Sequence, residues 1–253
     1  SSVQELVRRV RWGFAAAIIL AVLLPLVFGN WSPLKALGLL LAFWIIASLV
    51  ASLQQRWTGQ GAFMQRVRNQ SLSYYGMQLA HLGVAVFIIG VTVVKGYATE
   101  RDVRMDIGDT VDAGGYVFRF DGVREINGPN YVAGQARVTV SRNGKPVTEL
   151  YPEKRRYNAS GMPMTEAAIQ TGVFRDLYVS LGEPIPGERT AWAVRVYYKP
   201  FVDWIWAGCL LMALGGVLAI SDRRYRITSK KASRASDEAL PAGGAIAAGG
   251  KSS

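Results

Sequence analysis

The only histidine of this 253-residue chain, His81, is the residue best suited to bind a metal or cofactor. It lies five residues into an uncharged run, residues 76–94, where a neutral imidazole needs a hydrogen-bond acceptor or a metal. Three roles are open to it: a hydrogen bond to a neighbouring helix, ligation of a cofactor, or relay of a proton. The residue types alone favour the structural hydrogen bond.

The surroundings of His81 add information. Gly76, Gly83 and Gly90 recur every seven residues, so they form a stripe that a neighbouring helix could approach closely. A helix advances about 100° per residue, so His81 points about 200° away from Gly83. An apolar wall around one nitrogen ligand is the kind of surface that a haem requires. The side chains expected beside His81 are those of Met77, Gln78, Val84, Ala85 and Ile88.

Other reactive groups are few. Cys209 is the one cysteine, so the chain has no internal disulfide, no CxxC pair and no thiolate metal cage. It lies in an apolar run, and we therefore expect a packed side chain. One histidine also excludes a two-histidine site made by this chain alone. Asp203 is interpreted as an interfacial carboxylate beside Lys199. No Ser-His-Asp set and no phosphate-binding loop occurs.

Two basic groups could bind haem propionates or an acidic partner. They are the pair Arg101 and Arg104, and the run Lys154-Arg155-Arg156. Acidic neighbours balance both groups, which favours an ordinary solvated surface.

Four uncharged runs of 18 to 20 residues are long enough to cross a membrane as helices. So many such runs are not expected in a soluble core of this size. The predicted fold class is therefore an α-helical multi-pass membrane bundle of four transmembrane helices with an inserted, mainly β periplasmic domain. The runs cover residues 12–29, 36–55, 76–94 and 204–221.

The net charge of +11 follows this organisation. Residues 96–199 hold 14 Lys and Arg against 13 Asp and Glu, so the remaining residues carry +10 of the total. That surplus flanks the apolar runs, which is typical of a membrane protein and not of a nucleic-acid binder. The positive-inside rule places both termini and the 56–75 loop in the cytoplasm, and residues 96–200 in the periplasm.

The predicted domains follow from these runs. Residues 1–95 hold three transmembrane helices, 96–200 the periplasmic β-rich domain, and 201–221 the fourth transmembrane helix. Residues 222–253, rich in Ser, Ala and Gly, are expected to be a disordered cytoplasmic tail.

The periplasmic segment alternates apolar and polar residues in several short runs, which predicts a small β-sandwich or barrel of five or six strands. Asn143-Gly144 favours a type I′ hairpin turn between two of these strands. Only residues 164–169 suggest a helical turn. The predicted strands cover residues 116–123, 135–140, 147–151, 174–181 and 191–198.

Residues 70–226 closely resemble the C-terminal part of the CcmF family, haem-handling membrane proteins of cytochrome c maturation (System I). The order and spacing of many short motifs carry the resemblance, more than any one motif does. These motifs include AHLGVAV at 80–86, ERDVRM at 100–105, NGPN at 127–130, EKRRY at 153–157, MTEAAI at 164–169, RDLY at 175–178 and WAVRVYYKP at 192–200.

The resemblance implies a role in cytochrome c-type biogenesis in the bacterial inner membrane. Proteins of this family deliver haem from the haem chaperone CcmE to apocytochrome c. They are regarded as the haem lyase that forms the thioether bonds to the CxxCH thiols, working with CcmH-type subunits. They also hold a structural haem b through two transmembrane histidines. By its position in AHLGVAV, His81 resembles the second of these axial ligands, and so a ligand of the haem iron.

The chain also departs from the family pattern. The tryptophan-rich haem-binding motif, the two histidines that flank it and the first transmembrane histidine do not occur. The chain would supply one axial ligand of haem b and none for the substrate haem, and it holds no catalytic residue of its own. We expect this stretch to be inactive alone, and its start at Ser1 to reflect a truncated sequence in preference to a natural split subunit.

Two functions are compatible with these features of the sequence. The first is the C-terminal portion of a haem lyase. The alternative is a non-enzymatic membrane scaffold or haem-chaperone subunit that recruits partners through its periplasmic domain. A transporter or channel is disfavoured, because the predicted spans lack charges that would line a path.

Overall fold

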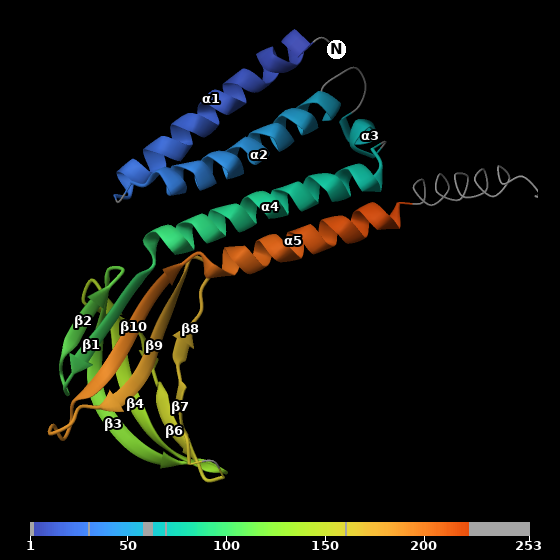
Figure 1. Ribbon diagram of the computed structural model, residues 1–253. Coiled ribbons are helices and arrows are strands. Elements are labelled where there is room, and N and C mark those ends of the chain that lie inside the picture. Colours follow the sequence, from blue (N-terminus) through green and yellow to red (C-terminus); the bar gives the residue numbers. More distant parts are fainter. Residues whose placement is uncertain (1–2, 30, 58–62, 69, 160, 223–253) are drawn as a thin grey trace, which may run out of the picture.

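The computed structural model describes residues 3–29, 31–57, 63–68, 70–159 and 161–222. Four long helices lie side by side in the order α1, α2, α4, α5, and a β domain lies at one end of α4 and α5 (Figure 1). Helix α3 is a short segment between α2 and α4. The helices are α1 (Val3–Val27), α2 (Pro33–Trp57), α3 (Phe63–Arg68), α4 (Leu72–Tyr97) and α5 (Val202–Ser221).

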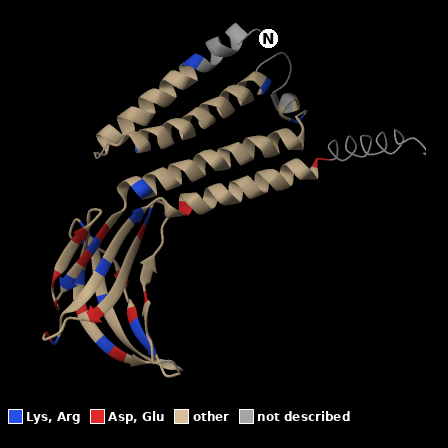
Figure 2. Ribbon diagram, viewed as in Figure 1, with Lys and Arg blue, Asp and Glu red and all other residues tan. Residues whose placement is uncertain are grey.

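Three of these helices, α2, α4 and α5, are long and apolar enough to cross a membrane, as predicted. Helix α1 covers the first predicted pass, although its apolar part, Arg11–Val27, is shorter. Figure 2 shows that the described charged residues gather near the helix ends and in the β domain. The predicted disordered tail lies outside the described residues, apart from Asp222.

The β domain is a sandwich of two antiparallel sheets, which settles the choice between sandwich and barrel. One sheet has the order β1-β10-β9-β8, and the other has the order β2-β3-β4-β6-β7 with β5 paired to β4. The strands are β1 (Thr99–Met105), β2 (Thr110–Ala113), β3 (Tyr116–Asn127), β4 (Tyr131–Arg142), β5 (Lys145–Leu150), β6 (Glu153–Tyr157), β7 (Pro163–Glu166), β8 (Ala168–Gln170), β9 (Arg175–Pro184) and β10 (Trp192–Pro200).

The core of the sandwich is formed by apolar residues that alternate with polar ones along the strands. Alternate residues of β3, β4, β9 and β10 point inward, and the two inner faces meet in one apolar cluster. Asn143 and Gly144 both have positive φ, at 51° and 75°, which confirms the predicted type I′ turn between β4 and β5. The central core residues are Phe118, Phe120, Val138, Val140, Leu177, Val179, Leu181, Val194 and Val196.

The helical turn predicted at residues 164–169 is wrong. These residues form β7 and β8, with Thr165 opposite Lys154 in one sheet and Ala168 opposite Val179 in the other. The chain crosses from one sheet to the other at Ala167, so neither strand is long enough to show a clear alternation.

The domain is joined to the membrane helices by two hydrogen-bonded strands. Strand β1 begins directly after α4 ends at Tyr97, and β10 ends at Pro200 just before α5. Thr99 pairs with Tyr198, so the entering and leaving strands are neighbours, as α4 and α5 are. Between β10 and α5, Phe201 takes the left-handed conformation, with φ of 59°. Two paired connections position the sandwich over the α4–α5 end.

Candidate functional site

One face of α4 packs closely against α5. A Cβ atom on Gly83 would stand 2.7 Å from the carbonyl oxygen of Gly208, and one on Gly76 would stand 2.5 Å from that of Gly215. No larger residue fits at such distances without movement of the backbone. The predicted close approach along the glycine stripe is confirmed.

A second face of α4 packs against α2. Gln78 is 8% exposed and donates its side-chain N–H to Ser52 Oγ at 3.0 Å, and Ser52 shares a 2.9 Å hydrogen bond with the hydroxyl of Tyr74. Ala85, one heptad after Gln78, is fully buried. The prediction that Gln78 and Ala85 line an open wall beside His81 is therefore wrong. They lie about 50° from His81 around the helix, which turns them toward α2.

His81 lies on the face of α4 that neither neighbour covers. Its side chain is exposed, as is that of Met77, which is 47% exposed. Val84 and Ile88 are partly buried on the same face. The uncovered face around His81 is apolar.

A local hydrogen bond orients the imidazole. His81 Nδ1 lies 2.8 Å from the carbonyl oxygen of Met77, one turn earlier. A carbonyl only accepts, so Nδ1 of the neutral ring carries the proton and donates it. Nε2 then keeps its lone pair, as a metal ligand requires. The hydrogen-bond partner is on the same helix, so the simplest structural role, a bond to a neighbouring helix, is not the one observed.

These features fit one side of a haem site. The face supplies one nitrogen ligand with a defined tautomer and an apolar wall, which axial ligation requires. Within the described ranges, no group of three His, Cys, Asp or Glu could hold a metal ion. A second axial histidine would have to come from outside this chain, whose only histidine is His81.

The lesser candidates occupy other places. The side chain of Cys209 is exposed, not packed as expected, because its neighbour Gly208 is the residue that faces α4. Asp203 lies in the first turn of α5. Burial of Asp176, and to a smaller extent the charge of Asp203, raise the pKa of the Asp176 carboxyl.

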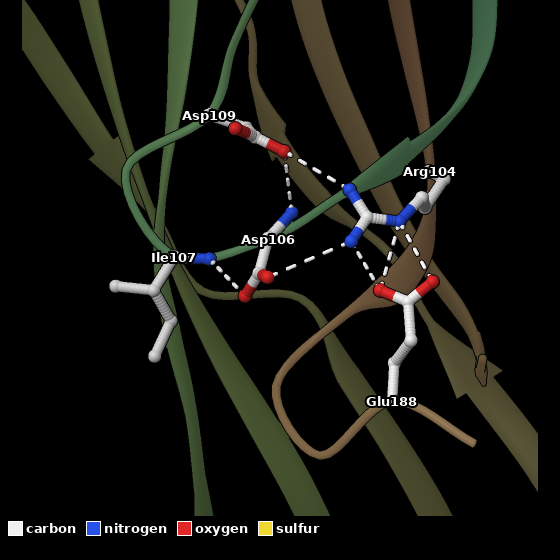
Figure 3. Close-up of polar contacts among 5 residues, drawn as sticks. All are labelled: Arg104, Asp106, Ile107, Asp109 and Glu188. Carbon is white, nitrogen blue, oxygen red and sulfur yellow. Dashed lines mark hydrogen bonds and ion pairs between the residues drawn. The ribbon is translucent and has the colours of Figure 1, made fainter. Parts of the chain in front are cut away.

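Arg104 of the ERDVRM motif is held by three carboxylates (Figure 3). Its guanidinium contacts both carboxylate oxygens of Glu188, with Nε 3.2 Å from Oε1 and 3.0 Å from Oε2, and lies 3.6 Å from Asp106 and from Asp109. Side-chain bonding to Thr190, the N–H of Ile107 and the charge of Arg104 lower the pKa of Asp106. Glu188 and Thr190 were not predicted as partners, because they lie more than 80 residues away along the chain.

Lys154 and Arg155 are also neutralised. Lys154 pairs with Glu183 at 2.7 Å, and Arg155 pairs with Glu153 at 2.8 Å and with Glu166 at 3.4 Å. The expected charge balance holds for both residues, with partners from three strands, but neither side chain is fully solvated: 18% of Lys154 and 25% of Arg155 is exposed.

Comparisons with known proteins place these features in one family. Residues 96–200 match the family described as CcmF C-terminal beta-sandwich. The cytochrome c-type biogenesis protein CcmF of Escherichia coli K12 is 49% identical over 214 residues, which cover 84% of this chain and 32% of that protein. CcmF of Pseudomonas aeruginosa is 47% identical over 218 residues, which cover 85% of this chain and 32% of that protein.

A solved structure, Cytochrome c Heme Lyase CcmF, matches with a TM-score of 0.65 at 18% identity. The match covers 87% of this chain and 35% of that chain. At this identity the match shows a shared fold alone. The chain spans about a third of the length of the curated relatives that it matches.

Proposed function

This chain belongs to the CcmF family of cytochrome c-type biogenesis proteins, whose C-terminal region it matches, and we propose that it supplies one axial ligand of a transmembrane haem b. In this proposal it is the C-terminal portion of a haem lyase in the bacterial inner membrane. The substrate haem is handled by a part of the protein outside this chain.

The observation that carries the proposal is the hydrogen bond and exposure of the His81 imidazole. The ring donates from Nδ1 to Met77, which leaves the Nε2 lone pair on an uncovered apolar face of α4. His81 lies nine residues after Leu72, about 14 Å along the helix axis, and therefore well inside the span. At this depth the Nε2 lone pair has no water to accept from, and a haem iron would bind it.

Each residue around His81 has a defined part. Met77 orients the ring through its carbonyl oxygen, while Gln78 and the glycine stripe hold α4 against α2 and α5. Met77, Val84 and Ile88 would exclude water from the ligand nitrogen. A haem bound here would supply a one-electron redox centre, with a potential set by its axial ligands and surroundings.

The sandwich is proposed to face the periplasm and to dock partners. The partners that the family resemblance suggests are a CcmH-type subunit, the haem chaperone CcmE carrying haem, and apocytochrome c. The paired strands β1 and β10 support this role, because they hold the domain firmly over the α4–α5 end. The cysteine thiols of a bound apocytochrome would then meet haem at a fixed place relative to the membrane.

The experiment uses the full-length protein with His81→Ala, and Leu82→Ala as the matched control on the next residue. We expect His81→Ala to lose the haem b absorption bands and Leu82→Ala to keep them. Added imidazole should restore part of the spectrum in His81→Gly, because it can occupy the space of the lost ring. Unchanged haem content per protein in His81→Ala would sink the ligand assignment.

The alternative function is a scaffold that only brings haem and apocytochrome together. The paired strands β1 and β10 suit this role as well, because a domain held over the α4–α5 end can keep a docked partner in place without taking part in the chemistry. Reconstitution with reduced haem and apocytochrome separates the two functions. A haem lyase should increase thioether formation beyond what a tethered pair of substrates shows at the same local concentration, whereas a scaffold should not.

A further inference from the structure

Two arginines of the β-sandwich converge on one buried phenol. The hydroxyl of Tyr116 accepts a hydrogen bond from Arg142 Nη1 at 3.1 Å and another from Arg175 Nε at 3.0 Å. The guanidinium carbons lie 4.9 and 5.0 Å from the centre of the Tyr116 ring. The two donor nitrogens are therefore at most about 6 Å apart.

The phenol at the centre of this site is fixed. Tyr116 is 5% exposed and stacks on Tyr198 with ring centres 6.0 Å apart. Tyr198 in turn closes over Gly114, where any Cβ atom would overlap its ring. The two guanidinium groups are consequently held near each other by a rigid support, although their charges repel.

No carboxylate of the described residues lies within ion-pair distance of either arginine, and the negative charge nearest in sequence to Arg175 is that of the neighbouring Asp176, which interacts with it at longer range. The ion pairs of the domain involve Arg104, Arg119, Arg137, Arg155, Arg195 and Lys154, and neither Arg142 nor Arg175 takes part in one. The adjacent Asp176 is buried and its carboxylate accepts the N–H of Gly172. Arg175 also donates to Gln170 at 2.8 Å, which leaves Nη2 and most N–H groups of Arg142 for a ligand.

The pair lies at the end of the sandwich that meets the membrane. Arg175 is opposite Pro200 in the sheet, one residue before Phe201. Phe174, the residue before Arg175, packs against Phe201 and against Trp204 in the first turn of α5. Aromatic residues at the end of a span mark the level of the lipid headgroups.

We propose that Arg142 and Arg175 bind the phosphate of an anionic phospholipid in the leaflet on the side of the sandwich. Guanidinium groups bind phosphate oxygens with paired N–H donors, and phosphates are the abundant anions at headgroup level. A bound phosphate would offset the repulsion of the two cations and hold the sandwich against the membrane surface. This inference does not depend on the function of His81.

The test is lipid binding by the full-length protein, measured by native mass spectrometry after delipidation. Phosphatidylglycerol is titrated against phosphatidylcholine as the neutral comparison. We expect Arg142→Gln with Arg175→Gln to weaken phosphatidylglycerol binding roughly tenfold or more. The control pair, Arg104→Gln with Arg195→Gln, removes arginines already neutralised by carboxylates and should leave that binding unchanged.

Two further arms keep the proposal falsifiable. In the single variant Arg142→Gln the buried hydroxyl of Tyr116 keeps its hydrogen bond from Arg175, so the fold should survive, and binding of the same lipid should weaken. Inorganic phosphate at millimolar concentration should not displace the lipid, because it lacks acyl chains to anchor it. Wild-type affinity in the arginine variants, equal loss in the control pair, or displacement by inorganic phosphate would each overturn the assignment.

Discussion

Gly83 of α4 and Gly208 of α5 meet backbone to backbone, and a Cβ atom on either would stand 2.7 Å from the carbonyl oxygen of the other. Gly76 and Gly215 repeat this contact one heptad away on each helix, with 2.5 Å on both sides. The α5 side of α4 is thereby closed to any ligand. Since α2 covers a second side, only the face that carries His81 remains available.

Adjacent glycines of α5 should respond in opposite ways to alanine. In Gly215→Ala the new Cβ would meet the backbone of α4, so we expect a loss of about 1–3 kcal/mol from forced separation of the helices. Gly216 has nothing within 4 Å of its Cβ position, so Gly216→Ala should be neutral or stabilise by up to about 1 kcal/mol through helix propensity. Thermal unfolding of the purified full-length protein compares the two, and equal effects would refute this packing.

Asp176→Asn should stabilise the sandwich at neutral pH. Burial, and then the charge of Asp203, raise the pKa of Asp176 in the folded state. A carboxyl with a raised folded pKa disfavours folding once pH exceeds the unfolded value near 3.9, and the full cost is present above the folded pKa. Asparagine keeps an oxygen acceptor for the N–H of Gly172 without the charge. Melting temperatures from pH 4 to 8 should converge for the two proteins at the acid end, and a lower melting temperature for Asp176→Asn at pH 7 would contradict the prediction.

Ionised Asp106 should stabilise the folded domain at neutral pH, whereas ionised Asp176 destabilises it. Hydrogen bonds from Thr190 and from the N–H of Ile107, and the charge of Arg104, lower the pKa of Asp106. Its stabilisation is therefore present above the unfolded pKa and is lost as pH falls through the lower folded value. Thr190→Val should raise the pKa of Asp106, whereas Thr190→Ser should keep it low, as measured by carboxyl NMR titration. An identical titration in both variants would remove Thr190 as the main cause.

The end of α5 should hold the start of α4 in place. Asp222 is 7% exposed and its Oδ2 accepts the N–H of Ser73 at 3.0 Å, in the first turn of α4. Asp222→Ala leaves that N–H without its acceptor and should cost about 1 kcal/mol, as loss of a helix cap does. Asp222→Asn retains an oxygen and should recover part of the loss. Proteolysis at the α3–α4 connection reports the effect, and equal cleavage of wild type and Asp222→Ala would argue against it.

Local periodicity predicted the four long helices and five of the ten described strands, namely β3, β4, β5, β9 and β10, so the expected number of five or six strands was too low. The uncharged runs, the Asn143-Gly144 turn and the alternation through residues 116–123 depend on neighbours a few positions apart, and the structure confirms helices, turn and strand there. The helical turn predicted at residues 164–169 is wrong because two short strands in different sheets, of four and three residues, show too few alternations to be recognised.

By itself the sequence determined that His81 is the only histidine and lies within an apolar run, that a glycine stripe lies on the opposite side of its helix, and that a β domain is inserted between apolar runs. Those conclusions need only residue type and spacing along one element. Only the tertiary structure decided that α2 buries Gln78 and Ala85, that Cys209 is exposed, and that Glu188 meets Arg104 across 84 residues. Such contacts depend on which element packs on which face, and no local pattern contains that information.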